Sequence, residues 1–177
     1  YSKSADSGNV KAMFNLAYLL HKGEPGVIEK DNKKAVELYT KASKKGLAQA
    51  QYNLGVLYLK GDDDIPINKK EAAELFEKAS KQGNCDAQLN LGFMYSKGDG
   101  VQVNMKKAIK LYKQAASQNN AKAQFNLGVI YSKGDGIEKN AVEAANYYQE
   151  ASDQNMNQAT FNLGVLYYKG DDNFPQD

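Results

Sequence analysis

The feature that most limits how this chain can fold is a short pattern that occurs five times along it. Each copy begins at an Ala and ends at a Gly eleven residues later: Ala12 to Gly23, Ala50 to Gly61, Ala87 to Gly98, Ala123 to Gly134 and Ala159 to Gly170. Such self-similarity is typical of chains built from stacked repeats, in which each repeat buries its apolar face against its neighbours. The sequence therefore predicts one continuous array rather than a domain with a single centre.

Each period contains two predicted helices. In the first, helix A, apolar residues recur at helical spacing, as Ala50, Leu54 and Leu57 do, and the closing Gly suits a helix C-terminus. The second, helix B, is expected to begin after an Asp or Asn that caps its first turn, at Asp31, Asn68, Asn104 and Asn140. It is expected to end at a residue that tolerates a left-handed backbone: Gly46, Gly83, Asn119 and Asn155. Only the A-to-B loops vary in length.

The predicted fold is an all-α solenoid, an α-α superhelix of antiparallel helix pairs. We expect a single array over residues 1–177, with a half repeat at 1–11, repeats that start near residues 12, 50, 87 and 123, and a half repeat at 159–177. Residues 1–8 align with the second half of a helix B, and the last residues align with an A-to-B loop. The sequence is therefore expected to be a fragment of a longer array.

The recurring residues resemble the Sel-one-like repeat (SLR) family, whose pattern is Ala-x-x-x-Leu-Gly-x-x-Tyr-x-x-Gly followed by Val/Ile-x-x-Asp/Asn-x-x-x-Ala and an aromatic-x-x-Ala. In the first copy, Ala17 and Leu20 replace the usual Gly and Tyr. The resemblance implies a right-handed superhelix similar to tetratricopeptide repeats, and a scaffold that assembles multiprotein complexes. A cysteine-rich branch of the family has been linked to β-lactam binding, and a chain with Cys85 alone does not resemble it.

Composition bears on the class of partner. The net charge is only +2, and all 23 basic residues are Lys, so the bidentate guanidinium that reads phosphate and guanine is missing and a nucleic-acid partner is not expected. No apolar run approaches the roughly 20 residues of a membrane span, and direct membrane insertion is not expected. A single Cys and no Asn-x-Ser/Thr acceptor weakly favour the cytoplasm or another reducing compartment.

No residues combine into a catalytic or metal-binding pattern, so we expect neither an enzyme, nor a cofactor, nor a metal site. His21 is the only His and is expected at the surface or in a groove. Asp62, Asp63 and Asp64 lack the Gly and Glu of a calcium loop and are expected to be solvated turn residues. Cys85 is expected to fill space at the turn before the third helix A.

A partner-binding surface is predicted from the helical wheel. The third, seventh and eleventh positions of each helix A, counted from its first Ala, share one face, which in the tetratricopeptide relatives lines the concave groove. We call it the helix-A face. Its residues are Phe14, Tyr18, Lys22, Tyr52, Val56, Lys60, Leu89, Phe93, Lys97, Phe125, Val129, Lys133, Phe161, Val165 and Lys169. Phe93 and Phe125 are the predicted hot spot. The alternative is that adjacent A helices bury these residues against each other.

An Asn occupies the fourth position of every helix A: Asn15, Asn53, Asn90, Asn126 and Asn162. Because Asn is a poor helix former, its side chain is expected to make a compensating hydrogen bond, either within the array or to a ligand, and we favour the first.

The predicted function is that of a scaffold or adaptor that binds a protein or peptide partner along the helix-A face. Two alternatives stay open. The chain could be a purely structural spacer of a large assembly, or the repeat domain of an enzyme or small-molecule-binding protein whose site lies outside this sequence.

Overall fold

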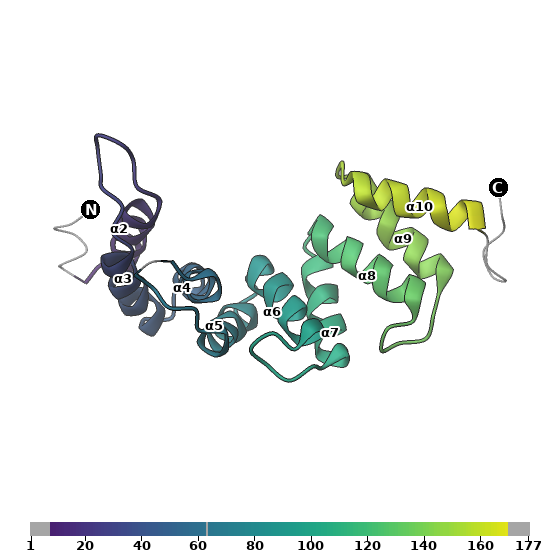
Figure 1. Cartoon of the computed structure of the whole chain (residues 1–177), viewed down its shortest axis with the longest axis horizontal. Helices are drawn as coiled ribbons and strands as arrows, with labels where there is room; N and C mark the ends of the chain where they lie inside the picture. Colours follow the sequence, from purple (N-terminus) through teal and green to yellow (C-terminus); the bar gives the residue numbers. More distant parts are fainter. Residues whose placement is uncertain (1–7, 63, 170–177) are drawn as a thin grey trace. The chain divides into compact units, whose positions relative to one another are not determined.

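The computed structural model describes residues 8–62 and 64–169, and within these ranges the regular structure consists of helices (Figure 1). Helix A of successive repeats is α2 (Val10–Lys22), α4 (Ala48–Lys60), α6 (Cys85–Lys97), α8 (Ala121–Lys133) and α10 (Asn157–Lys169). Helix B is α3 (Asn32–Lys44), α5 (Lys69–Lys81), α7 (Met105–Ala116) and α9 (Ala141–Ser152). The predicted all-α architecture is confirmed. Parts of both predicted half repeats, Gly170 and Asp63 lie outside the described residues.

Helix A starts two residues earlier than its first Ala. The side chains of Asn9, Asn84 and Asn120 accept hydrogen bonds from the backbone amides of Ala12, Ala87 and Ala123, at 3.1, 2.8 and 3.0 Å. An Asn that binds an amide of the first turn satisfies a group that the helix leaves unpaired, so the helix begins directly after that Asn. The sequence analysis did not identify these Asn caps.

The predicted ends of helix B are confirmed. Asp31, Asn68, Asn104 and Asn140 cap the four helices, and each side chain accepts from the amide three residues later. At the other end, Gly46, Gly83, Asn119 and Asn155 have φ angles of 89°, 84°, 63° and 63°. These are left-handed conformations, which Gly and Asn adopt more easily than other residues.

Backbone hydrogen bonds make each helix pair antiparallel. The amides of Asp31, Asn68, Asn104 and Asn140 donate to the carbonyls of Leu20, Tyr58, Tyr95 and Tyr131, near the end of the preceding helix A. A second set joins each helix B to the next helix A: Leu47, Asn84, Asn120 and Met156 donate to Ala42, Ala79, Ala115 and Ala151. Because these bonds involve the backbone alone, they recur in repeats whose side chains differ.

The described chain divides into two compact units. In the first, which contains α2 to α5, residues 85–91 of α6 and residues 99–102, α2 packs on α3, α3 on α4, and α4 on α5. In the second, which contains residues 92–98 and 103–169, α7 packs on α8, α8 on α9, and α9 on α10. The buried rings of helix B are central to both units: Tyr39 and Phe76 in the first, Tyr112 and Tyr148 in the second.

In α4, α6 and α8, a glycine lies against the buried ring of the following helix B. A Cβ built on Gly55, Gly92 or Gly128 would lie 2.7, 2.9 or 2.6 Å from the nearest ring carbon of Phe76, Tyr112 or Tyr148. Such distances are shorter than side chains tolerate, so the ring can lie against the helix backbone only because the glycine has no side chain. In α2 the equivalent residue is Ala17, which is fully buried.

The longest A-to-B loops, in the first two repeats, are joined by a polar network. The carboxylate of Asp62 accepts hydrogen bonds from the buried side chain of Asn32 and from the Asp64 and Ile65 amides, and Lys30 Nζ lies 3.6 Å from it. His21 Nδ1 lies 2.8 Å from Asn32 Oδ1 on the other side. Asp62 and Asp64 are exposed as expected, but Asp62 also holds these two loops together.

None of the helices in the described part of the chain is both long and apolar enough to cross a lipid bilayer.

A substitution pair tests the glycine contact. Gly128→Leu should lower the free energy of unfolding by about 1–3 kcal/mol, because the new side chain would displace the Tyr148 ring. Gly164→Leu is the matched control, since no described atom lies within 4 Å of a Cβ built there. Urea denaturation of both variants would measure the difference, and equal stability of the two would show that the ring contact does not require a glycine.

A pH titration tests the Asp62 network. Burial acts to raise the pKa of Asp62, but the hydrogen bonds from Asn32, Asp64 and Ile65 and the charge of Lys30 outweigh it and hold this pKa below its usual 3.8. The network therefore stabilises the fold above that pH, and its contribution disappears as the pH falls through the lowered pKa. Asp62→Asn should lower Tm at pH 7, and its Tm should converge with that of the parent only at pH values below the lowered pKa of Asp62.

The control for this titration is Asp64→Asn, since Asp64 forms an exposed ion pair with Lys33. If Asp62→Asn lowered Tm by the same amount at pH 7 and at the lowest pH of the titration, the result would contradict the role of the carboxylate charge.

Candidate functional site

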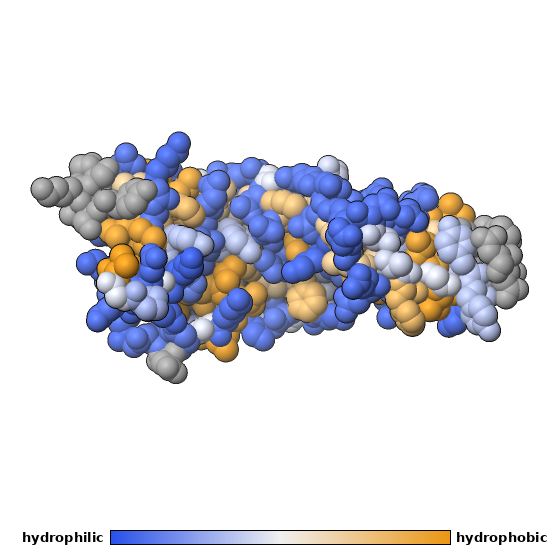
Figure 2. Space-filling view, turned by 90° about the horizontal axis from the view of Figure 1, so that it is seen from above, coloured by the Kyte–Doolittle hydropathy of each residue, from blue (hydrophilic) through white to orange (hydrophobic). Residues whose placement is uncertain are grey.

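The fifteen residues of the helix-A face are all at least partly accessible, and adjacent helices do not bury any of them. The exposed fraction is 47% for Tyr18, 48% for Phe93 and 70% for Phe161. Every Lys at the eleventh position is exposed. The side of the molecule in Figure 2 shows hydrophobic surface, in orange, divided by hydrophilic side chains, in blue. None of these residues is therefore fully buried, as the alternative of burial between adjacent A helices would require.

In α2, α4 and α8 the ring at the third position packs onto the buried ring of the following helix B. The ring centroids are 5.8 Å apart for Phe14 and Tyr39, and 5.9 Å apart for Phe125 and Tyr148, with the planes tilted. Tilted pairs at this distance are favourable. Phe125 is thus half-buried and supports the core, whereas Phe93, at the seventh position, is exposed. The two members of the predicted hot spot have different environments.

A pocket of about 350 Å³ lies within the second unit, between α6, α7 and α8. We call it the first pocket. Its lining combines residues of the helix-A face with neighbours from the same unit: Phe93, Ser96, Lys97, Val103, Met105, Tyr112, Asn126, Val129, Ile130, Lys133, Asp135 and Gly136.

A second pocket, of about 450 Å³, lies between α8, α9 and α10 in the same unit. Its lining residues are Val129, Ser132, Lys133, Lys139, Tyr148, Asn162, Val165, Leu166 and Lys169. Every one of them is found 36 residues after a residue of the first pocket, as Asn162 is after Asn126 and Lys169 after Lys133. The second pocket is therefore the first pocket repeated one period later, and Val129 and Lys133 belong to both.

Two of the repeated positions differ in chemical character. Phe93 in the first pocket corresponds to Val129 in the second, and Val103 corresponds to Lys139. The first pocket also contains Asp135 beside its two lysines, whereas the second contains three lysines and no carboxylate among the described residues that line it. Among the residues that the structure describes, Phe93 thus makes the first pocket the more apolar of the two.

Four of the five recurring Asn side chains divide into two groups. Asn53 donates to the Tyr39 hydroxyl at 3.1 Å, and burial raises the pKa of that hydroxyl to about 12. Asn90 is hydrogen-bonded to Tyr52. For these two residues the predicted structural role is confirmed. Asn126 and Asn162 line the first and second pockets, where neither amide has a hydrogen-bond partner among the residues that the structure describes.

The sequence analysis missed a buried Gln that follows the first Ala of helix A in three repeats. In the first unit Gln82 donates to Gln51 at 2.8 Å, and Gln51 donates to the Ser43 carbonyl. In the second unit Gln154 donates to Gln124 at 2.6 Å. The repeated Ala-Gln pair was the available signal. These amides satisfy one another's hydrogen-bonding groups, so their role is to fix the ends of neighbouring helices.

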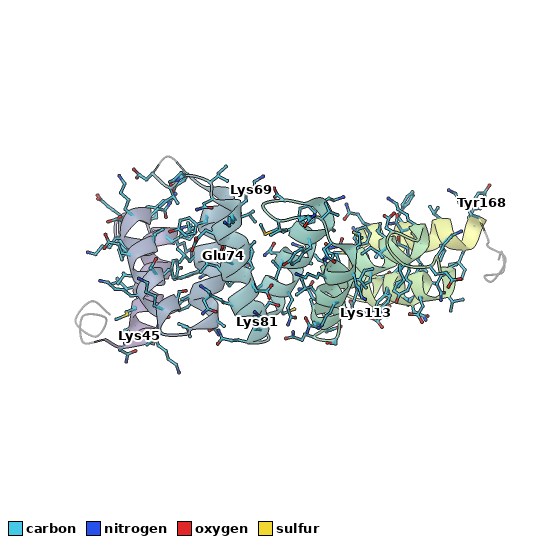
Figure 3. The ribbon with its side chains drawn as sticks, turned by 90° about the horizontal axis from the view of Figure 1, so that it is seen from below. Lys45, Lys69, Glu74, Lys81, Lys113 and Tyr168 are labelled. Atoms are coloured by element: carbon cyan, nitrogen blue, oxygen red, sulfur yellow. The ribbon has the colours of Figure 1, made fainter. Side chains whose placement is uncertain are left out.

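In the described part of the chain, the other side chains that could take part in catalysis or metal binding do not form a site. Cys85 is the partly buried first residue of α6, and the described residues contain no group of three or more His, Cys, Asp or Glu side chains that could hold a metal ion. On α7, Lys113, labelled in Figure 3, lies 5.5 Å from the ring of Tyr131, which stacks on Tyr147. Its contact with Tyr131 raises the pKa of Lys113, so this lysine stays charged and is engaged within the fold.

Two solved structures with similar folds are described as repeat proteins of this kind. The crystal structure of c5321, a protective antigen of uropathogenic Escherichia coli with an SLR fold, matches with 32% identity and a TM-score of 0.90, over 96% of this chain and 36% of that one. A Sel1 repeat protein from Oxalobacter formigenes matches with 33% identity and a TM-score of 0.84, over 91% of this chain and 63% of that one.

The immunity protein Pa5087 of Pseudomonas aeruginosa is 29% identical, with a TM-score of 0.57 over 99% of this chain and 62% of that one. The chain therefore spans about a third of the length of the E. coli antigen and less than two thirds of the other two proteins. No curated protein matches the sequence.

The family profile described as Sel1 repeat matches residues 10–47, 48–84, 85–120, 121–156 and 157–177. Each of the first four matched segments contains one complete A–B helix pair, and the last contains α10. Nearly the whole chain is thus accounted for by this profile, and the chain belongs to the Sel1 repeat family.

Proposed function

We propose that this chain is a scaffold that binds an extended segment of a partner protein along the helix-A face. Sel1 repeat proteins are generally scaffolds for protein interaction rather than enzymes. We further propose that the helix-A face is the binding surface and that Phe93 is its main anchor.

The observation that carries this proposal is the repetition of one pocket along the face. Two neighbouring pockets with equivalent linings can accept two side chains that lie on the same side of a single bound chain. A segment that crosses both pockets also passes Asn126 and Asn162, whose amides can donate to and accept from its peptide groups. Partly buried amides without a partner gain most from such a ligand.

The charges of the face favour an acidic segment. Lys97, Lys133 and Lys169 are exposed along its edge in the second unit, and Asp135 is the only carboxylate among the described residues that line either pocket. Lysines at a rim act mainly on the rate of association and add salt dependence, while apolar anchors inside a pocket supply most of the affinity.

Site-specific crosslinking tests the proposal and separates it from a spacer role. A photo-crosslinking residue at Phe93 or Val165 should capture a partner in the source cell, and the same residue at exposed Lys110 on α7 should not. Mass spectrometry of the captured peptide would identify the segment. Equal capture from all three positions, or capture from Lys110 alone, would move the binding surface away from the helix-A face.

A substitution series with the captured segment tests the roles of individual residues. Phe93→Ala should weaken binding by roughly 1–3 kcal/mol if the ring anchors the ligand. Lys97→Ala and Lys133→Ala should mainly slow association at low salt. Phe93 is exposed, so its removal should leave Tm unchanged, whereas Phe125→Ala should also lower Tm because Phe125 packs on Tyr148. Full affinity in a folded Phe93→Ala variant would exclude Phe93 as the anchor.

A further inference from the structure

We infer that the Asn126 amide binds a main-chain peptide group of an extended partner segment, and that Ser96 is a positioning residue that keeps this amide free to do so. Asn162 and Ser132 repeat the arrangement one period later. This inference rests on the proposed function. It adds which chemical group of the ligand is bound, and it gives a role to serines that need not touch the ligand.

The buried tyrosine of helix B has a different hydrogen-bond partner in the two units. In the first unit, Asn53 donates to the Tyr39 hydroxyl at 3.1 Å. The tenth residue of the preceding helix A is His21, and its ring is hydrogen-bonded to Asn32 instead. The recurring Asn is therefore the residue that satisfies the tyrosine hydroxyl in this unit, and its amide is engaged within the fold.

In the second unit the tenth residue of helix A is a Ser, and this Ser is the partner of the tyrosine. Ser132 Oγ lies 3.4 Å from the Tyr148 hydroxyl. Burial raises the pKa of Tyr112, and a hydrogen bond with Ser96 acts in the opposite direction. A buried hydroxyl that already has a partner gains little from a second one. The Asn of the next helix A is therefore not drawn to the tyrosine.

The amides that are left free face the two pockets. In the described part of the chain, no buried side-chain nitrogen or oxygen lacks a hydrogen-bond partner, so an amide without a partner has to be accessible. Asn126 and Asn162 have no partner among the described residues, and they line the first and the second pocket. Each pocket thus offers one amide to a ligand.

A primary amide fits a peptide group better than it fits a charged group. Its oxygen accepts and its NH2 group donates, and a peptide chain offers an N–H and a C=O in return. A carboxylate only accepts and an ammonium group only donates, so either one would leave half of the Asn126 amide unpaired. In an extended segment the N–H and C=O of one residue point to the same side, where a single amide can bind both. Main-chain bonds of this kind add affinity, and the apolar part of the pocket selects the side chain.

A backbone scan of a bound peptide tests the main-chain contact. A phage-displayed library of short random peptides, with the 177-residue chain as bait, supplies the probe. In synthetic copies of an enriched peptide, one backbone N–H at a time is replaced by an ester oxygen. One replacement should weaken binding to the parent chain about three- to tenfold. Asn126→Ala should weaken binding of the unmodified peptide by a similar factor, and the ester should then have no further effect. Esters that weaken binding to both chains equally overturn the contact.

A rescue experiment tests the positioning role of Ser96. Ser96→Ala should weaken binding of the same peptide about three- to tenfold, because the Tyr112 hydroxyl then takes the Asn126 amide, as happens in the first unit. Adding Tyr112→Phe removes this hydroxyl and should restore the affinity. A Ser96 that only touched the ligand or only stabilised its helix would not be rescued in this way. Unchanged affinity of Ser96→Ala, or a loss that Tyr112→Phe does not restore, overturns the positioning role.

Ser117→Ala is the matched control. Ser117 Oγ donates to the Gln114 carbonyl as Ser96 Oγ donates to the Phe93 carbonyl, at 2.9 and 2.8 Å, but Ser117 lines neither pocket. Its removal should leave the affinity unchanged. An equal loss in Ser117→Ala would show that the effect of Ser96→Ala comes from the helix and would overturn the positioning role.

The remaining outcomes separate this inference from the proposed function. Peptides whose binding depends on Phe93 but not on Asn126 overturn the inference and leave the proposed function standing. Peptides that depend on neither residue, or the absence of any enriched peptide, overturn the inference and also remove the support for the helix-A face as the binding surface.

Discussion

The structure depends on the contact between a glycine of helix A and an aromatic ring of the following helix B. At Gly55, Gly92 and Gly128 the ring occupies the space that a side chain would need, so the two helices can approach closely. The ring is then buried with the small Ala residues of its own helix, such as Ala108 and Ala115 beside Tyr112. Close approach also brings the cap of helix B within hydrogen-bond distance of the end of helix A, so packing and backbone pairing reinforce each other.

Most of the fold could be predicted from the sequence because its signals recur. Caps such as Asn68 and Asn140, and left-handed ends such as Gly83 and Asn155, follow from residue types with narrow conformational preferences, and repetition separates them from chance. The starts of helix A were placed two residues late because only three of its five caps are Asn, while Leu47 offers no side-chain hydrogen bond. A cap that varies between repeats gives a weaker signal.

The candidate site was less predictable. Helical periodicity placed Phe93 and Phe125 on one face, but it could not show that Phe125 packs on a tyrosine of α9 while Phe93 is exposed. That difference arises from tertiary contacts between residues more than twenty positions apart in the sequence. The polar network of Asp62 was missed for a similar reason, since its partner Asn32 comes from the previous repeat and lies 30 residues away. Periodicity assigns a residue to a face and leaves its contacts undetermined.

The sharing of Val129 and Lys133 by two pockets has an evolutionary consequence. A mutation at either residue alters two neighbouring subsites together, so selection on one ligand side chain is constrained by the next. Val103 and Lys139 each line only one of these two pockets, and a mutation there can retune one subsite while the other keeps its preference. Specificity in such an array is therefore expected to diversify first in the A-to-B loops and at the beginning of helix B, and last in the middle of helix A.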